Sequence, residues 1–362
     1  MLTHLPQHAI TLHQSMTVDM AADGLPAKLI TLVNQHGMSV TLMDIGATWL
    51  SCCVPVTVNQ QPELREVLLG VSTLTDFYQQ RAYLGATVGR YANRIAAGKF
   101  SIDGEDYQVS VNQNGNCLHG GENGFNHRRW QMQQENATEV QFSLLSVDGD
   151  MGFPGNLQVV VTYTLTENNE LTIRYSAETD KPTVVNLTNH GYFNLLGADS
   201  GDDCLSHQLM INADHYLPTD QTGIPWGEFK TVEATSFDFR QLKRINQDWL
   251  VDNDQQQAQG YDHAFILHPD VRRATTACAT AIAPDNSLIM DVLTTKPAMQ
   301  LYTGNFLAGC PNQMGGEYVN YSGFALETQF LPDSPNHPEW QDNDATLRPN
   351  EHYHYLTCYR FR

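Results

Sequence analysis

The residues best suited to acid–base chemistry gather in residues 183–195, where an apolar run changes into a cluster of polar and aromatic side chains. This segment reads Thr-Val-Val-Asn-Leu-Thr-Asn-His-Gly-Tyr-Phe-Asn-Leu, and its histidine is His190. A buried strand has no structural need for so many hydrogen-bonding groups, because each one left without a partner costs about 1–3 kcal/mol. A lone histidine on a strand is more often a core residue than a catalyst, so the assignment depends on other segments.

Four further segments carry hydrogen-bonding side chains beside glycines or at expected strand ends: 89–95, 116–121, 260–263 and 323–329. With residues 183–195 they supply an amide, a guanidinium, two imidazoles and two carboxylates. These side chains are Asn93, Arg94, His119, His190, Asp262 and Glu327. Recognition of a polyhydroxylated molecule requires such a mixture, because every sugar hydroxyl both donates and accepts hydrogen bonds. Nearby aromatic residues suited to an apolar sugar face are Tyr91, Phe125, Tyr192 and Phe193.

Three of these residues also have a structural explanation. Arg94 could pair with an acidic loop, and Asp262 could close a turn. Glu327 lies in an apolar strand-like segment, where a charged side chain is ordinarily exposed on the alternate face because burying it unpaired is costly. The combination of segments, rather than any single residue, favours a functional site.

The sequence gives no sign of a cofactor or a metal. Nucleotide-binding, metalloprotease and α/β-hydrolase signatures are missing, and the seven cysteines have neither disulfide-framework nor zinc-knuckle spacing. His352 and His354 would share one face of a strand and could bind a metal, but a partly exposed strand near the C-terminus is the simpler explanation. We therefore expect chemistry by side chains alone, in a reducing compartment.

The charge of the chain limits its partners. A net charge of −20, from 40 acidic and 20 basic residues, disfavours nucleic acid, anionic membranes and heavily phosphorylated substrates. No segment approaches the roughly 18 apolar residues of a membrane span, and the N-terminus lacks the pattern of a signal peptide. We expect a neutral small-molecule partner, no membrane and a cytoplasmic location.

From Leu29 onward, apolar and polar residues alternate in short, turn-bounded runs, as is typical of strands with one buried face. Three hairpins are expected, with turns at 103–104, 167–170 and 284–287. Helix is expected only at 72–81 and 238–247. Three Gly- and Asn-rich segments are expected to be loops that carry binding residues: 112–129, 197–226 and 312–321.

No repeat, linker or composition shift divides the 362 residues. Residues 1–362 are therefore expected to form a single all-β domain, a large β-sandwich of two packed sheets with a few short helices. Residues 1–24 are expected to be an N-terminal extension or a first strand.

Five motifs, in order along the chain, resemble the galactose mutarotase (aldose 1-epimerase) family: Gly-Arg-Tyr-Ala-Asn-Arg-Ile, Leu-His-Gly-Gly, Thr-Asn-His-Gly-Tyr-Phe-Asn-Leu, Tyr-Thr-Gly-Asn-Phe and Leu-Glu-Thr-Gln. The similarity runs from about Leu29 to Phe361. The resemblance implies a galactose mutarotase-like supersandwich with an open cleft and no cofactor. It also implies an isomerase that interconverts the α and β anomers of free aldoses such as galactose and glucose.

Residue by residue, the resemblance implies that Glu327 is the general base and His190 the general acid, with His119 close to the ring oxygen. It places four side chains on sugar hydroxyls: Asn93, Arg94, Asp262 and Gln300. The chemistry suits these residue types, because opening a pyranose removes the proton of the C1 hydroxyl while the ring oxygen is protonated. A monomer and a homodimer are both compatible with the sequence.

Three rival functions remain open. A glycosidase would use Glu327 and Asp262 as its two carboxylates. A non-catalytic sugar-binding protein should lack the acid or the base, and both are present. A sugar-phosphate epimerase would need a basic pocket, of which this acidic chain shows little sign outside residues 128–129 and 243–244.

Overall fold

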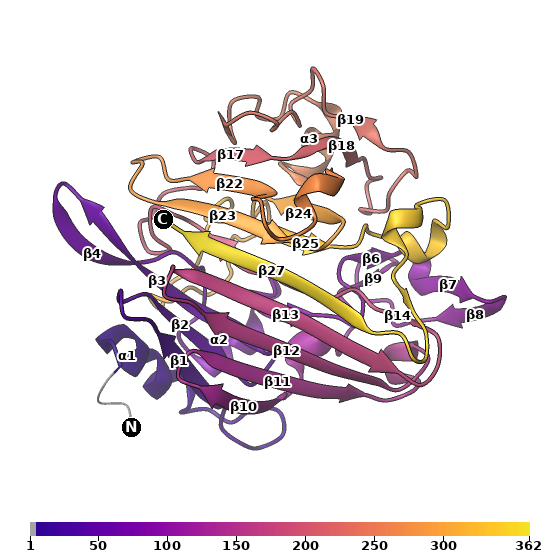
Figure 1. Cartoon of the computed structure of the whole chain (residues 1–362), viewed down its shortest axis with the longest axis horizontal. Coiled ribbons are helices and arrows are strands. Elements are labelled where there is room, and N and C mark those ends of the chain that lie inside the picture. The colour runs from indigo at the N-terminus through magenta and orange to yellow at the C-terminus, as the bar shows by residue number, and fades with distance from the viewer. Residues whose placement is uncertain (1–4) are drawn as a thin grey trace.

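A computed structural model describes residues 5–362. Its largest element is a nine-stranded antiparallel sheet, which fills the front of Figure 1. In spatial order its strands are β10 (Gln131–Asn136), β11 (Glu139–Ser146), β12 (Leu157–Leu165), β13 (Glu170–Thr179), β27 (Tyr353–Phe361), β23 (Ile289–Thr294), β22 (Ala279–Ile282), β17 (Gln208–Ile211) and β20 (Lys243–Arg244). The C-terminal strand β27 thus lies in the middle of the sheet and joins chain segments that are far apart in sequence.

Two smaller antiparallel sheets lie behind the nine-stranded sheet (Figure 1). The six-stranded sheet has the order β16 (Tyr192–Phe193), β25 (Phe324–Gln329), β24 (Ala298–Tyr302), β21 (Asp262–Leu267), β18 (Ala213–Leu217) and β19 (Lys230–Thr231). The four-stranded sheet has the order β1 (Leu29–Val33), β2 (Ser39–Met43), β3 (Thr48–Val58) and β4 (Gln61–Glu66). This arrangement confirms the predicted all-β sandwich.

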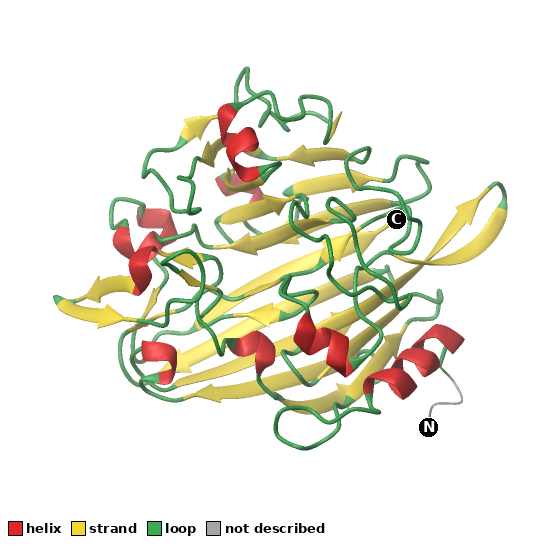
Figure 2. Ribbon diagram, turned by 180° about the vertical axis from the view of Figure 1, so that it is seen from behind, coloured by secondary structure: helices red, strands yellow, loops and turns green. Residues whose placement is uncertain are grey.

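Short strand pairs and helices complete the fold. The pairs are β5 (Thr87–Val88) with β15 (Thr188–Asn189), β6 (Arg94–Ile95) with β9 (Cys117–Leu118), β7 (Lys99–Ile102) with β8 (Glu105–Gln108), and β14 (Thr183–Val184) with β26 (Thr346–Leu347). The α-helices are α1 (Gln7–Met16), α2 (Leu74–Gln79) and α3 (Asn253–Ala258). Figure 2 shows that loops and short helices gather on the side opposite to the view of Figure 1.

Aromatic side chains from three sheets join the layers. Trp49 of β3, Phe193 of β16 and Tyr359 of β27 pack with ring centroids 5.2–5.7 Å apart. All three are almost completely buried. Aromatic pairs at such spacing add about 0.5–1.5 kcal/mol each beyond the burial of their area. This cluster fixes β16, and with it the segment that carries His190, against the large sheet.

The three predicted hairpins are confirmed as β7–β8, β12–β13 and β22–β23. The helix expected at 72–81 is confirmed as α2, which begins where the Asp76 amide donates to Thr73 Oγ1 at 3.1 Å.

The helix expected at 238–247 is wrong. Phe237 and Phe239 are buried in alternation with Asp238, a period of two, and residues 243–244 pair with β17 as β20. The loop expected at 197–226 is also wrong in part, because it contains β17 and β18. Their short alternating pattern was hidden among glycines and aspartates.

Near the N-terminus, residues Gln7–Met16 form helix α1 rather than a first strand. Ala9 and Met16 of α1 are buried. His8 and His13 reach Ser39 and Thr31 of the four-stranded sheet at 3.1 and 3.0 Å. Residues 1–4 lie outside the described part of the chain.

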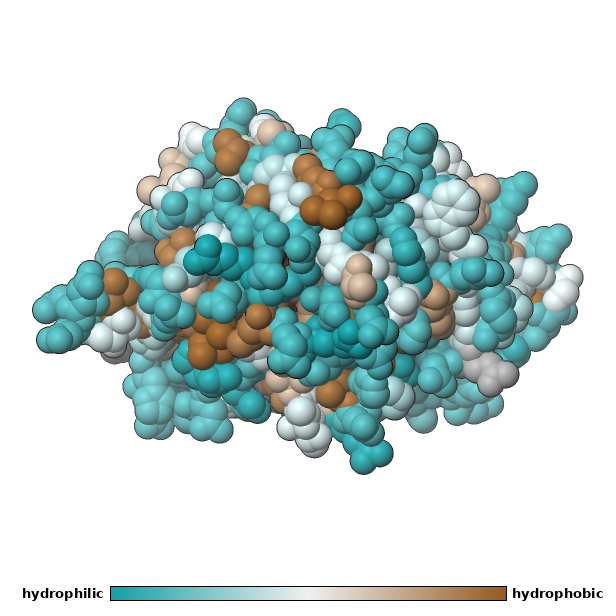
Figure 3. Space-filling model, turned by 90° about the horizontal axis from the view of Figure 1, so that it is seen from above, coloured by the Kyte–Doolittle hydropathy of each residue, from teal (hydrophilic) through white to brown (hydrophobic). Residues whose placement is uncertain are grey.

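The surface is mostly hydrophilic in the view of Figure 3, where apolar residues form only small, separated patches. Exposed large apolar side chains include Trp226, Phe306 and Met314. Within residues 5–362, no helix combines the length and the apolar character that crossing a membrane requires.

Candidate active site

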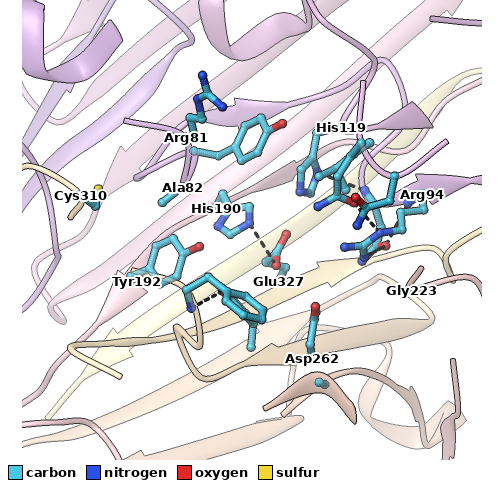
Figure 4. Close-up of a pocket in the computed structure, with 18 of the residues that line it drawn as sticks. Arg81, Ala82, Arg94, His119, His190, Tyr192, Gly223, Asp262, Cys310 and Glu327 are labelled. Atoms are coloured by element: carbon cyan, nitrogen blue, oxygen red, sulfur yellow. Dashed lines mark hydrogen bonds and ion pairs between the residues drawn. The ribbon is translucent and has the colours of Figure 1, made fainter. Parts of the chain in front are cut away.

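A cavity of about 580 Å³ opens above the six-stranded sheet. Its walls come from loops that are distant in sequence, among them 79–83, 219–223 and 308–311. Six of the seven predicted site residues line it: Asn93, Arg94, His119, His190, Asp262 and Glu327. Figure 4 shows the side chains of His119, His190, Arg94 and Asp262 around Glu327.

Three neighbouring strands bring two acidic side chains to the base of the cavity and place one amide beside them. Gln300 of β24 is paired with Glu327 of β25, and Gln300 Nε2 donates to Asp262 Oδ1 of β21 at 2.7 Å. Gln300 does not line the cavity itself but holds Asp262 in place. Its Oε1 atom and Glu327 Oε2 are buried without a partner among the described residues. Such groups are costly unless a ligand satisfies them.

Glu327 is 2% exposed, so the ordinary expectation of a surface carboxylate on this strand is wrong. All six residues of β25 are buried, because loops cover one face of the strand and the large sheet covers the other. Burial, together with the charge of Asp262, raises the pKa of Glu327 to about 8, although Arg94 opposes this shift.

His190 faces Glu327 across the base of the cavity, with Nε2 3.5 Å from Oε1 (Figure 4). The backbone of His190 is held on both sides, since its amide donates to Ala86 and its carbonyl accepts from Gly85, both at 2.9 Å. Burial lowers the pKa of His190 to about 4. Because burial disfavours charge on both groups, the pair holds a single proton near neutral pH.

His119 occupies a turn with a positive φ of 51°. Its Nδ1 atom accepts the backbone amide of Asn93 at 3.1 Å, and its own amide donates to the Asn93 carbonyl at 3.0 Å. Because an acceptor nitrogen carries no proton, the neutral ring must carry its proton on Nε2. Burial, with His190 and Arg94 nearby, lowers the pKa of His119 well below its usual value. The ring is therefore a neutral N–H donor.

Arg94 forms no salt bridge with any described residue, so the expected alternative of an acidic loop partner is not found. Its Nε atom donates to Gln113 at 2.9 Å and an Nη atom lies 3.4 Å from Asn93 Oδ1. Gly223 packs against the guanidinium, and a Cβ there would lie 2.6 Å from Arg94 Cζ. The glycine thus leaves room for the charged group beside the cavity.

Comparison with known proteins identifies the family. The family model described as aldose 1-epimerase matches residues 28–360. An aldose 1-epimerase from Haemophilus influenzae is 50% identical over 342 residues, which cover 94% of this chain and 98% of that relative. The chain belongs to the aldose 1-epimerase family.

Two further comparisons agree. An aldose 1-epimerase from Escherichia coli K12 is 49% identical, with 95% of this chain and 98% of that relative covered. The crystal structure of an aldose epimerase homologue from C. elegans has a TM-score of 0.83 at 30% identity and covers 93% of this chain and 99% of that chain. The expected family and its fold are both confirmed.

The prediction that four aromatic residues line the pocket is wrong for three of them. Tyr91, Phe125 and Phe193 are core residues, and the Tyr91 hydroxyl donates to the Leu331 carbonyl at 2.8 Å. Of the four aromatic residues expected there, Tyr192 alone lines the cavity. Tyr83, which the sequence analysis missed, also lines it. The run Arg-Ala-Tyr-Leu-Gly around Tyr83 contains no polar cluster that would single it out.

Three potential metal ligands, His119, His190 and Glu327, have donor atoms within 4.8 Å of one another. His119 suits a metal poorly, however. Its Nδ1 lone pair accepts the Asn93 amide, and its Nε2 therefore carries the proton, whereas a ligand nitrogen needs a free lone pair.

Removal of metals is accordingly expected to leave turnover unchanged. The measurement is the rate of mutarotation before and after exhaustive dialysis against a chelator. Loss of activity that added zinc restores would contradict this expectation.

Proposed function

We propose that this member of the family interconverts the α and β anomers of free aldohexoses such as galactose and glucose, with Glu327 as general base and His190 as general acid. The observation that carries the proposal is the 3.5 Å approach of His190 Nε2 to Glu327 Oε1 inside the cavity. The reaction moves a proton between two oxygens bonded to one carbon, the C1 hydroxyl and the ring oxygen. An acid and a base that lie side by side match that arrangement.

Burial leaves the shared proton of the resting pair on Glu327, so ring opening begins after this proton moves to His190, which gives a Glu327 carboxylate and a His190 imidazolium. Glu327 takes the proton of the C1 hydroxyl while His190 gives its proton to the ring oxygen, and the C1–O5 bond breaks. The pair then consists of a protonated Glu327 and a neutral His190, so it still holds one proton. Each such positioned group contributes about 10²–10⁴ in rate.

Ring closure uses the same two groups in reversed roles. After rotation about the C1–C2 bond, the C5 hydroxyl attacks the other face of the aldehyde. His190 takes the proton of that hydroxyl while Glu327 returns its proton to the carbonyl oxygen. The starting protonation is restored without a cofactor, and the shared proton of the buried pair serves both directions.

His119 supports this reaction as a hydrogen-bond donor. Its Nε2–H is aimed by the Nδ1 contact to the Asn93 amide, and proton transfer from a neutral imidazole is far less favourable than transfer from an imidazolium. We therefore assign the proton transfer to His190 and a stabilising hydrogen bond near the ring oxygen to His119.

The remaining predicted residues are proposed to hold sugar hydroxyls. Asn93 and Arg94 supply donors to the cavity, and Asp262 supplies an acceptor. Gln300 orients Asp262 and offers its unpartnered Oε1. We further propose a cytoplasmic protein, because its seven cysteines are all buried and free. Both a monomer and a homodimer would support this chemistry.

Polarimetry tests the proposed function. Purified protein should accelerate the change in optical rotation of freshly dissolved α-D-galactose and α-D-glucose beyond the spontaneous rate. It should not release nitrophenol from a nitrophenyl galactoside, which separates the epimerase from a glycosidase that uses Glu327 and Asp262. Release of nitrophenol without accelerated mutarotation would contradict the proposal.

A further inference from the structure

The imidazole of His190 contacts two tyrosine rings. Tyr192 stacks on it with a centroid distance of 4.9 Å and an interplanar angle of 28°. Tyr83 stacks with a distance of 5.8 Å and an angle of 22°. Both tyrosines line the cavity. The catalytic ring is therefore packed against two aromatic rings.

This packing replaces a hydrogen bond that such a histidine ordinarily has. A histidine that transfers protons through one ring nitrogen is usually oriented by a carboxylate or carbonyl at the other nitrogen. The Nδ1 atom of His190 is buried and has no partner among the described residues. Rotation of the ring about its Cβ–Cγ bond is thus limited by the flanking tyrosines rather than by a hydrogen bond.

The loop that carries Tyr83 is itself held in place. The side-chain carbonyl of Gln80 accepts the amides of Ala82 and Leu84, at 2.8 and 3.4 Å, on either side of Tyr83. Gln80 is buried, and its own Nε2 atom donates to the Phe77 carbonyl at 3.2 Å. The Gln80 side chain therefore fixes the backbone on both sides of Tyr83.

The same loop is tied to the backbone of His190. Gly85 donates to the His190 carbonyl, and His190 donates to the Ala86 carbonyl, both at 2.9 Å. Asn189 Nδ2 also donates to the Gly85 carbonyl at 2.7 Å. Three hydrogen bonds thus tie the backbone that follows Tyr83 to residues 189–190.

Tyr83 also contacts the second histidine. Its ring meets that of His119 edge to face at 4.5 Å and 62°. Its phenolic oxygen makes no hydrogen bond to any residue in the described part of the chain, whereas the ring touches both imidazoles. The Tyr83 side chain therefore contacts the two histidines through its ring and not through its hydroxyl.

We propose that Tyr83 is a positioning residue for mutarotation, whose ring, together with that of Tyr192, fixes the plane of the His190 imidazole so that Nε2 is directed at the ring oxygen. The inference rests on the proposed role of His190 as the acid. Misplacement of a reacting group by about 1 Å can lower a rate by about 10², so loss of the ring should be felt in catalysis.

The test compares Tyr83→Leu with Tyr83→Phe by polarimetry on α-D-galactose. Tyr83→Leu should lower kcat by about 10- to 100-fold and change KM by less than about threefold. Tyr83→Phe keeps the ring and should retain kcat within about threefold. Tyr83 has a positive φ of 56°, so Tyr83→Asn, a residue that tolerates this backbone, provides a second variant without the ring if Tyr83→Leu does not fold.

The matched control is Tyr78→Leu. Tyr78 stacks on His127 at 6.3 Å and 14° but does not line the cavity. Its loss should leave kcat unchanged.

Three results would overturn the proposal: full kcat in the variants without the ring, equal losses in Tyr83→Leu and Tyr83→Phe, or a rise in KM alone. His190→Gln measured in parallel keeps the two inferences separate. If His190→Gln remains active, the acid role proposed for His190 fails, and the inference about Tyr83 fails with it. If His190→Gln is inactive while Tyr83→Leu is as active as wild type, only the role of Tyr83 fails.

Discussion

Replacement of Glu327 by Gln is expected to lower kcat for mutarotation by at least about 10². The amide keeps the volume of the side chain and much of its hydrogen bonding but cannot accept the proton of the C1 hydroxyl. Because the carboxyl is buried and disfavours charge, a neutral amide should not weaken the fold, and sugar binding should largely survive. Polarimetry measures kcat, and calorimetric titration with galactose measures binding.

The chain offers a matched control for this variant. Glu178 also contacts a histidine, His352, at 2.8 Å, but both side chains are exposed and far from the cavity lining. Glu178→Gln should leave kcat unchanged. If Glu327→Gln instead turned over sugar within a few-fold of wild type, Glu327 would not be the base. Its carboxylate would then be a residue that binds the sugar.

His190→Gln is expected to lower kcat by a similar factor, at least about 10². Glutamine can donate a hydrogen bond toward the ring oxygen, but it cannot release a proton to it. KM should change little, because binding depends mainly on the hydroxyl contacts proposed for Asn93, Arg94 and Asp262. The control is His352→Gln at the exposed pair. A His190→Gln variant with near wild-type kcat would transfer the acid role to His119.

Local sequence patterns predicted the sheets well because hairpins such as β12–β13 alternate buried and exposed residues around a short polar turn. They failed where structure depends on distant contacts. Residues 243–244 become a strand only by pairing with β17. The burial of Glu327 could not be read from its own segment, because the layers that cover β25 come from other parts of the chain.

The polar residues that line the cavity were predictable because their motifs combine polar side chains with glycine-rich turns. The residues that orient them were not. Gln80 and Tyr83 act through a clamped loop and aromatic packing, and neither leaves a local pattern. The hydrogen bond from Gln300 to Asp262 could not be predicted either, because it depends on the pairing of β21 with β24.

The central claim is that Glu327 and His190 act as one unit that shares a single proton. A double-mutant cycle on kcat, with Glu327→Gln, His190→Gln and the combined variant assayed by polarimetry on α-D-galactose, tests it most directly. If acid and base serve one concerted step, the double variant should be no more than about tenfold slower than the slower single variant. Losses that multiply, to about 10⁴ or more, would show that the two groups act independently and would contradict the shared-proton mechanism.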